Sequence, residues 1–365
     1  MPLIPEPVAS SPLTVGICIG TYNQGQYLRA AIESALAQTY PIQEIWIADD
    51  GSSDDTQAIA EEYSGNHANV HYHRHPENVG PARNLSWVLG RPATDLVVRL
   101  DSDDRLEPRY VEVLAGLMHK HPQAGYAHCD VWETDGEGRR TRPRQLSRAI
   151  EYEAPEAALK SNSNGFRTAA NCILFRADAI REANYYLAHP TWKASEDWDL
   201  ALRMALNGWG NVYAAEKLTN YRQWDDPKGE RAYRKIQEVS SNTEIFKTVL
   251  IPLYRERGWS IAPLQRNMRR KAAGFADSLD SPNFSEKDRE EYKAYLKDLG
   301  DSASLSLAIA LAELGVNPLL RKWKRTKRKA KDTVKRLLRS IRPVRAGAAY
   351  SKITIDVPKA ESAKY

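Results

Sequence analysis

Short apolar runs alternate with amphipathic stretches over the first 130 residues, and this alternation restricts the fold more than any other feature of the chain. The apolar runs are rich in β-branched residues and end sharply, as strands do, and they lie at residues 13–20, 44–49, 70–74, 95–101 and 126–132. Between them, apolar residues recur at helical spacing, as at Leu28, Ala31, Ile32, Ala35 and Leu36. This β-α-β-α series predicts an α/β fold with a largely parallel sheet and helices on both faces.

The pattern changes after residue 130. A turn at residues 135–138 is followed by an arginine- and proline-rich stretch, residues 139–148, which we expect to be an exposed loop. A strand at 171–175 and helices at 177–183 and 197–207 come next. From about Gly229 the chain is polar, poor in glycine and helical in its periodicity, which predicts an α-helical C-terminal extension.

Apolar content and cysteine usage restrict the class of protein. Hydrophobic residues make up 42% of the chain and charged residues 27%, as in ordinary globular proteins. No run approaches the ~20 apolar residues that a spanning helix needs, and residues 1–13 show no signal-peptide pattern. The three cysteines, Cys18, Cys129 and Cys172, form no close pair in sequence, which favours the reducing cytoplasm.

The net charge of +5 is unevenly distributed along the chain. Residues 321–345 hold thirteen Lys and Arg against one acid, so this stretch carries +12 and the rest of the chain −7. Six apolar residues recur among the basic ones at helical spacing: Trp323, Ala330, Val334, Leu337, Leu338 and Ile341. We expect residues 318–345 to form a basic amphipathic helix that binds an anionic membrane surface, with a solvated tail or a nucleic-acid contact as the alternative.

Three acids lie within four positions where one expected strand ends, at Asp101, Asp103 and Asp104. Clustered carboxylates repel one another unless a cation neutralises them, and Mg²⁺ and Mn²⁺ prefer such oxygen ligands. A cation bound there would also attract a diphosphate. The alternative is a solvated turn whose acids favour the start of the following helix.

Polar residues also follow the first two expected strands. Thr21, Tyr22 and Asn23 come after the first, and Asp49 and Asp50 end the second. The carboxyl edge of such a sheet is where α/β folds bind ligands. An acid at this edge can accept a hydrogen bond from an imide-type base.

Two expected helix starts add further polar groups. Asn78 and Arg83 stand at the first, from which Arg83 can reach a phosphate with two parallel hydrogen bonds. The second opens with Glu196 and Asp197, with Ser195 as its cap. The alternative for this second start is an acid-rich first turn without a catalytic role.

These motifs, in this order, resemble those of the family-2 glycosyltransferases, which have the GT-A fold. The resemblance covers residues 13–225 and rests on Thr-Tyr-Asn at 21–23, Asp-Asp-Gly-Ser at 49–52, Asn-Val-Gly-Pro-Ala-Arg-Asn at 78–84, Asp-Xaa-Asp at 101–103 and Glu-Asp at 196–197. It implies a Rossmann-like, mostly parallel sheet and an inverting, metal-dependent sugar transfer. The implied donor is a UDP-, GDP- or dTDP-linked sugar, and the acceptor is a glycan or lipid-linked hydroxyl in cell-surface polysaccharide synthesis.

The resemblance also implies a role for each motif. The donor nucleotide would be held by Thr21, Tyr22, Asn23, Asp49, Asp50, Asn78 and Arg83. The sugar and diphosphate would contact Asp101, Ser102 and Glu196. Mn²⁺ or Mg²⁺ would bind to Asp103 and Asp101, and Asp197 would be the general base. The enzyme would work on the cytoplasmic side of a membrane, on its inner face, with no nucleic-acid partner.

The chain departs from the family pattern at one place. Family members often continue with Tyr-Arg-Xaa-His, whose His assists metal or diphosphate binding, whereas residues 221–224 here end in Trp224. Asp225 or Asp226 would then substitute, or diphosphate oxygens and water would complete the coordination of the metal.

Two other functions fit parts of the pattern. A sugar nucleotidyltransferase shares this kind of sheet but gives Asp197 no role, and a nucleic-acid-binding protein with a degenerate GT-A body would use the basic tail. The divisions that we expect are a flexible N-terminus at residues 1–12, a GT-A catalytic domain at 13–226, a helical region at 227–317, the basic helix at 318–345 and a disordered tail at 346–365.

Overall fold

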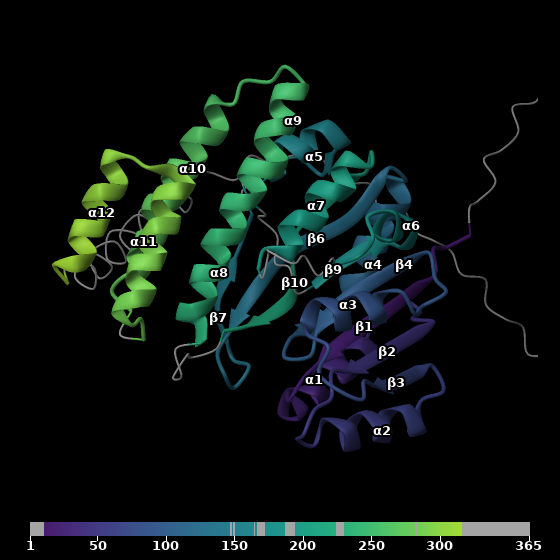
Figure 1. The fold of residues 1–365 in the computed structure, drawn as a ribbon. Helices are drawn as coiled ribbons and strands as arrows, with labels where there is room; N and C mark the ends of the chain where they lie inside the picture. The colour runs from purple at the N-terminus through teal and green to yellow at the C-terminus, as the bar shows by residue number, and fades with distance from the viewer. Residues whose placement is uncertain are drawn as a thin grey trace, which may run out of the picture. The chain divides into compact units, whose positions relative to one another are not determined.

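The computed structural model describes residues 11–146, 148, 150–163, 165, 172–186, 194–223, 230–281 and 283–315. Its centre is one sheet (Figure 1), in which the described strands follow the order β3-β2-β1-β4-β9-β6-β10-β5, with β7 beside β6 and β8 beside β10. The first four strands run parallel: β3 (Val70–Arg74), β2 (Glu44–Asp49), β1 (Val15–Thr21) and β4 (Leu96–Asp101). This parallel half confirms the fold expected from the alternation, and β2 and β3 have the predicted bounds.

Helices cover both faces of the sheet because each face is apolar and has to be buried. The first face packs against α1 (Gly25–Leu36), α2 (Thr56–Asn66) and α4 (Tyr110–Lys120). The opposite face packs against α3 (Pro81–Leu89), α6 (Ala177–Glu182) and α7 (Glu196–Leu206).

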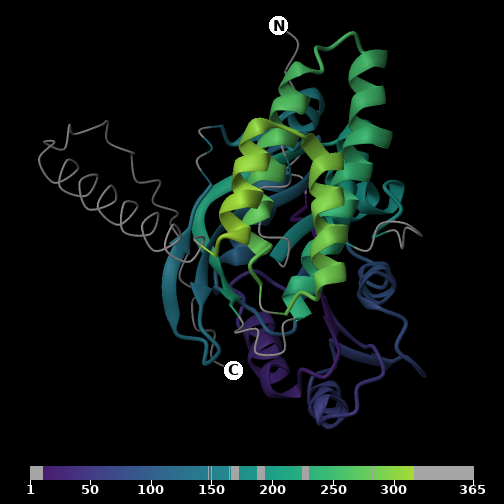
Figure 2. The same cartoon turned by 60° about the vertical axis from the view of Figure 1, so that its left-hand side comes forward.

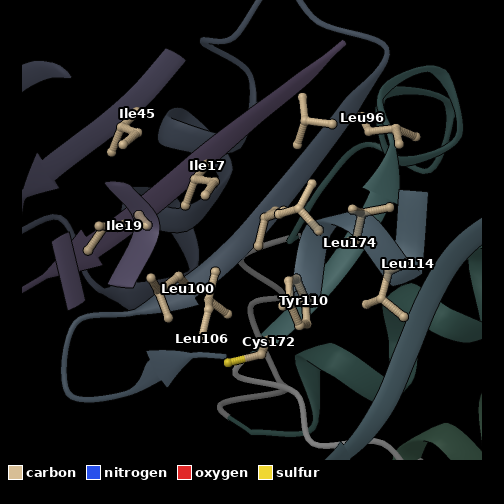
Figure 3. Close-up of a cluster of buried hydrophobic side chains, with 14 of the residues drawn as sticks. Ile17, Ile19, Ile45, Leu96, Leu100, Leu106, Tyr110, Leu114, Cys172 and Leu174 are labelled. Atoms are coloured by element: carbon tan, nitrogen blue, oxygen red, sulfur yellow. The ribbon is translucent and has the colours of Figure 1, made fainter. Parts of the chain in front are cut away.

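Apolar side chains from neighbouring strands form the core on the first face. Figure 3 shows Ile17, Leu100 and Leu174, from β1, β4 and the next strand along the sheet, in one cluster with Tyr110 and Leu114 of α4. These five side chains are fully buried. The core therefore fixes the ends of the parallel strands, and with them the loops that follow.

The second half of the sheet is mixed in direction. β9 (Cys172–Arg176) runs antiparallel between β4 and β6 (Ala124–Thr134), whereas β10 (Gly210–Arg222) runs parallel to β6. The sequence pattern does not predict β10, because register shifts around Lys217 interrupt its alternation. The two-residue strand β5 (Arg105–Leu106) pairs antiparallel with β10.

The stretch expected to be a loop, residues 139–148, begins instead with a strand. β7 (Arg140–Arg144) pairs antiparallel with β6, and all five of its residues are exposed. The Asp135 carboxylate accepts the backbone N–H of Arg139 at 2.9 Å and closes the turn before β7. The loop expectation is wrong because arginine and proline are also tolerated in an exposed strand at the edge of a sheet.

Two short elements lie between β7 and β9 in sequence. They are β8 (Tyr152–Glu153), which pairs antiparallel with β10, and α5 (Pro155–Asn162).

Helices follow β10, as expected for an α-helical extension (Figures 1 and 2). They are α8 (Glu230–Glu244), a π-helical turn (Ile245–Leu250), α9 (Ile251–Glu256), α10 (Ala262–Phe275), a 3-10 turn (Ala276–Ser278), α11 (Glu286–Gly300) and α12 (Ala303–Glu313). Their apolar side chains share one cluster with Leu159 of α5 and with Trp198 and Leu202 of α7. The helical region is thus packed onto the element that carries Asp197.

Contacts between residues divide the chain into one unit of residues 1–313 and a second of residues 314–365. The N-terminal segment 1–10, the boundary residue Asp226, the basic segment 318–345 and the tail 346–365 lie outside the described residues. Among the helices that are described, none is both long enough and apolar enough to cross a bilayer.

Candidate active site

The carboxyl edge of the parallel strands brings together polar residues from separate parts of the sequence. In the register of the sheet, Thr21 of β1 lies beside Asp49 of β2, and Gly20 lies beside Asp101 of β4. The loops after three strands therefore meet at one edge, where α/β sheets bind ligands.

Asp101, Asp103 and Asp104 form an acidic cluster at this edge. Each offers one carboxylate oxygen, and the three oxygens lie within 4.8 Å of one another. The Asp104 N–H donates to the Asp101 carbonyl at 3.0 Å, so a tight turn brings the acids together. A donor set of oxygens alone fits a hard divalent cation. The cluster includes Asp104, which the sequence-based assignment of metal ligands leaves out.

Arg222, the last residue of β10, fixes this turn. Its N–H donates to Asp104 Oδ1 at 2.7 Å, and its Nε donates to the Asp103 carbonyl at 2.8 Å. Its guanidinium carbon also lies 4.3 Å from the centre of the Tyr27 ring. The residues at the departure from the family pattern lie beyond the described part of this strand: Trp224, Asp225 and Asp226.

Asp49 and Asp50 are buried and already hydrogen-bonded within the protein. Asp49 Oδ2 accepts the hydroxyl of Tyr72 at 3.0 Å. Asp50 accepts the backbone N–H groups of Val79 and Gly80 at 2.7 and 3.0 Å. Both acids therefore shape the loops around the expected nucleotide site. Each Asp50 oxygen, with one N–H partner among the described residues, keeps a lone pair for a ligand.

Thr21, Tyr22 and Asn23 form the turn after β1. Thr21 is buried, and its Oγ1 has no hydrogen-bond partner among the described residues. A buried hydroxyl of this kind is costly until a ligand or water pairs with it. Asn23 has a positive φ of 51°, and its N–H donates to Ser52 Oγ at 2.9 Å, which joins this turn to the loop after β2. Tyr22 is 49% exposed.

Asn78 and Arg83 stand on either side of the start of α3. Asn78 Oδ1 accepts the N–H of Gly80 at 3.0 Å, within the turn that precedes the helix. Arg83 is exposed and makes no ion pair with another described residue. Ser102, next to the acidic cluster, is buried and donates its hydroxyl to Gln24 Oε1.

Asp197, on the first turn of α7, is joined to the end of β4 by one arginine. Arg99 Nη1 donates to Asp197 Oδ1 at 2.6 Å, while Arg99 Nε and Nη2 donate to the two oxygens of Asp101 at 2.8 and 3.2 Å. Burial opposes the charge of Arg99, but Asp101, Tyr186 and Asp197 outweigh it and hold the arginine's pKa well above its ordinary value. Sequence reasoning missed Arg99, although a charged residue inside the apolar run of β4 was a signal.

Glu196 and Ser195 complete the start of α7. Burial, and then the charge of Asp197, raises the pKa of the Glu196 carboxyl above its ordinary value. Ser195 occupies the N-cap position, as expected, and its carbonyl accepts the N–H groups of Trp198 and Asp199, both at 3.1 Å. Its side chain makes no capping bond, because its backbone is left-handed, with a φ of 74°, instead of the β-region conformation typical of side-chain caps. Its hydroxyl lies 3.4 Å from Nδ2 of Asn242 in α8.

Residues 16–182 match the family model described as glycosyl transferase family 2. This segment is a glycosyl transferase family 2 domain. EpsE, a Bacillus subtilis protein named as a glycosyltransferase, is 27% identical over 220 residues, which cover 60% of this chain and 76% of EpsE. The Escherichia coli chondroitin synthase is 41% identical over 125 residues, 34% of this chain and 18% of the synthase. A Streptococcus pyogenes hyaluronan synthase is 36% identical over 117 residues, 30% of this chain and 28% of the synthase. The chain thus spans less than a third of either synthase.

Solved structures share the fold at low sequence identity. TarS 1–349 of S. aureus, in complex with UDP-GlcNAc, aligns with a TM-score of 0.52 and 16% identity over 83% of this chain and 92% of TarS 1–349. The mannosyltransferase PcManGT of Pyrobaculum calidifontis, in complex with GDP-Man and Mn²⁺, aligns with a TM-score of 0.51 and 15% identity over 86% of this chain and 84% of its own. The chain therefore has the GT-A-type α/β fold that the motifs imply, followed by a helical region.

Proposed function

We propose that this glycosyltransferase moves a sugar from a nucleotide-sugar donor to an acceptor hydroxyl and inverts the anomeric configuration. The observation that carries the proposal is the shared contact at Arg99. One guanidinium holds Asp101, at the expected donor site, and Asp197, the expected base, which lies 98 residues from Arg99 in sequence. A leaving-group site and a base at one edge are what a single displacement requires.

The donor nucleotide occupies the loops after β1, β2 and β3. Two features of the site support this position: among the described residues, the Thr21 hydroxyl has no hydrogen-bond partner and the Arg83 guanidinium has no ion-pair partner. The remaining residues of the nucleotide site are Tyr22, Asn23, Asp49, Asp50 and Asn78. A nearby diphosphate would give Arg83 the planar, bidentate partner that guanidinium groups prefer.

Asp101 and Asp103, with Asp104 beside them, would hold Mn²⁺ or Mg²⁺. When bound, the cation would neutralise charge on the departing diphosphate. The donor set supports this assignment, because it consists of carboxylate oxygens alone. We assign Ser102 and Glu196 to contacts with the sugar or the diphosphate.

Asp197 takes the proton of the acceptor hydroxyl as the hydroxyl oxygen bonds to the anomeric carbon and the nucleoside diphosphate leaves. One displacement inverts the configuration, and no carboxylate nucleophile is needed. A sugar nucleotidyltransferase on this sheet would leave Asp197 without a role, and the family match also favours sugar transfer.

The likeness to EpsE and to the two synthases supports polysaccharide synthesis as the setting. The ligands named for TarS and PcManGT support a UDP- or GDP-linked donor, and the Mn²⁺ of PcManGT supports a divalent cation. A glycan or lipid-linked glycan is the acceptor. We also propose that residues 318–345 hold the enzyme on the anionic inner face of the cytoplasmic membrane, near such an acceptor.

The experiment is the substitution Asp197→Asn. Because it removes the proton acceptor and keeps the shape, we expect transfer to fall by about 10²–10⁴-fold while Mn²⁺-dependent donor binding stays within about threefold. The donor is chosen by thermal-shift screening of UDP-, GDP- and dTDP-sugars with Mn²⁺, and the acceptor from a panel of glycans. Asp178→Asn, at an exposed ion pair on α6, is the matched control. Near-normal transfer by Asp197→Asn would remove Asp197 from the mechanism.

A further inference from the structure

We propose that Arg99 is the positioning residue of the base, and that it couples Asp197 to the donor site through Asp101. This inference rests on the proposed function, because it gives Arg99 its role through Asp197. Arg99 itself touches neither the acceptor nor the donor in this role. It acts by fixing where one carboxylate points.

All three nitrogen atoms of the Arg99 guanidinium donate hydrogen bonds. Nε and Nη2 form a fork on the two oxygens of Asp101, at 2.8 and 3.2 Å. Nη1 donates to Asp197 Oδ1 at 2.6 Å and to the Tyr186 hydroxyl at 3.0 Å. A planar group with five donors can hold two carboxylates at once, which a lysine ammonium cannot do with the same geometry.

This contact lies largely out of solvent. The side chain of Arg99 is 11% exposed and that of Asp197 is 26% exposed. An apolar pocket borders Asp197 on the α7 side and is lined also by Tyr126, Ile173, Phe175, Tyr186, Leu200, Ala201 and Met204. Charge-assisted hydrogen bonds are strong in such surroundings. Removing the Arg99 guanidinium would leave the carboxylates of Asp101 and Asp197 without this partner.

The geometry separates the two oxygens of Asp197. Oδ1 receives the Arg99 bond, whereas Oδ2 makes no hydrogen bond to a described residue. Oδ2 is therefore the atom that takes the acceptor proton. Arg99 stays protonated throughout, since a guanidinium does not lose its proton in proteins, so it can stabilise the carboxylate without competing as a base.

The shared arginine also links the two halves of the site. Asp101 belongs to the acidic cluster, and Asp197 belongs to α7, which packs on the second face of the sheet. Because the rigid guanidinium of Arg99 bonds to both carboxylates, it fixes the position of Asp197 relative to Asp101. Loss of Arg99 should therefore lower turnover more than it weakens donor binding.

The test compares Arg99→Met, Arg99→Lys and Arg176→Met in the full chain. Arg176, on β9, is the matched control, because its guanidinium bonds to the carbonyls of Ala124 and Met118 away from the acidic cluster. At saturating donor and Mn²⁺, we expect Arg99→Met to lower kcat for transfer by about 10²-fold or more and Arg99→Lys to recover part of it. We expect donor KM to change by less than about tenfold, and Arg176→Met to keep the parent's kcat. If Arg99→Met does not fold, Arg99→Lys, which keeps the buried charge, provides the test.

A double-substitution cycle with Asp197→Asn separates positioning from a general structural effect. If Arg99 acts through Asp197, adding Arg99→Met to Asp197→Asn should lower kcat by no more than about threefold further. Additive losses, or an Arg99→Met enzyme with the parent's kcat, would overturn the inference. Full activity of Asp197→Asn itself would instead overturn the proposed function, so the two failures are distinguishable.

Discussion

The carboxylates of the site differ in their exposure and in the hydrogen bonds that they accept. Asp50 and Asp104 are each 2% exposed and accept backbone N–H groups, so the chain itself fixes their positions. Asp103 is partly exposed, so a cation in solvent can reach its carboxylate, and its backbone carbonyl accepts the Arg222 Nε–H. Of these acids, Asp103 is the one that we expect to bind a cation most directly.

The substitution Asp103→Asn tests this expectation. It removes one charged oxygen ligand, so we expect Mn²⁺-dependent binding of the nucleoside diphosphate to weaken at least about tenfold, or ~1.4 kcal/mol. Isothermal calorimetry with and without Mn²⁺ measures the change, with Asp178→Asn as the control. Unchanged Mn²⁺ dependence would place the cation on other residues.

At the scale of elements, α7 is held from two sides. Arg99 of β4 contacts its first turn, and the C-terminal helices pack against the residue after Asp197. Trp198 is 3% exposed, its ring meets that of Phe246 edge-on at 5.2 Å, and its Nε1 donates to the Asn162 carbonyl at 2.6 Å. We therefore expect the packing of the helical region to influence how α7 presents Asp197.

We expect Trp198→Ala to show this dependence. Emptying a buried tryptophan site should cost about 3–5 kcal/mol of unfolding free energy. It should also lower kcat, because the start of α7 loses its support. Thermal unfolding and transfer assays measure the two effects, and Trp198→Phe should keep most of both because it preserves the ring contact. A destabilised Trp198→Ala enzyme with the parent's kcat would show that the C-terminal helices do not determine the position of Asp197.

At the scale of the whole molecule, charge is divided between two parts. Residues 321–345 carry +12 against −7 elsewhere, so an anionic surface attracts one part and repels the other. Each basic residue close to an anionic bilayer contributes about 1 kcal/mol, reduced by salt. We therefore expect residues 321–345, and not the rest of the chain, to bind such a surface.

Flotation with vesicles measures the docking. We expect the full chain to bind vesicles that contain phosphatidylglycerol, to release as salt rises, and to bind neutral vesicles poorly. A chain ending at Asn317 should lose binding and keep transfer to a water-soluble acceptor. Binding that survives this truncation, or that ignores anionic lipid, would contradict the membrane role.

The sequence by itself determined the parallel half of the sheet and the residues at its carboxyl edge. Strand periodicity is local, so the bounds of β2 and β3 followed from the residues within each run. Parallel strands align their ends, and the acids at Asp49 and Asp101 therefore had to fall at one edge. The order of the motifs was enough to indicate the family.

Only the tertiary structure decided which distant groups meet. Arg99 is visible in the sequence as a charge inside an apolar strand, but its partner Asp197 is 98 residues away and is chosen by how α7 packs on the sheet. β7 and β10 also form strands because of tertiary contacts. Their pairing with β6 outweighs the weak strand pattern of their own residues. Contacts between remote segments depend on packing, which no local pattern of residues records.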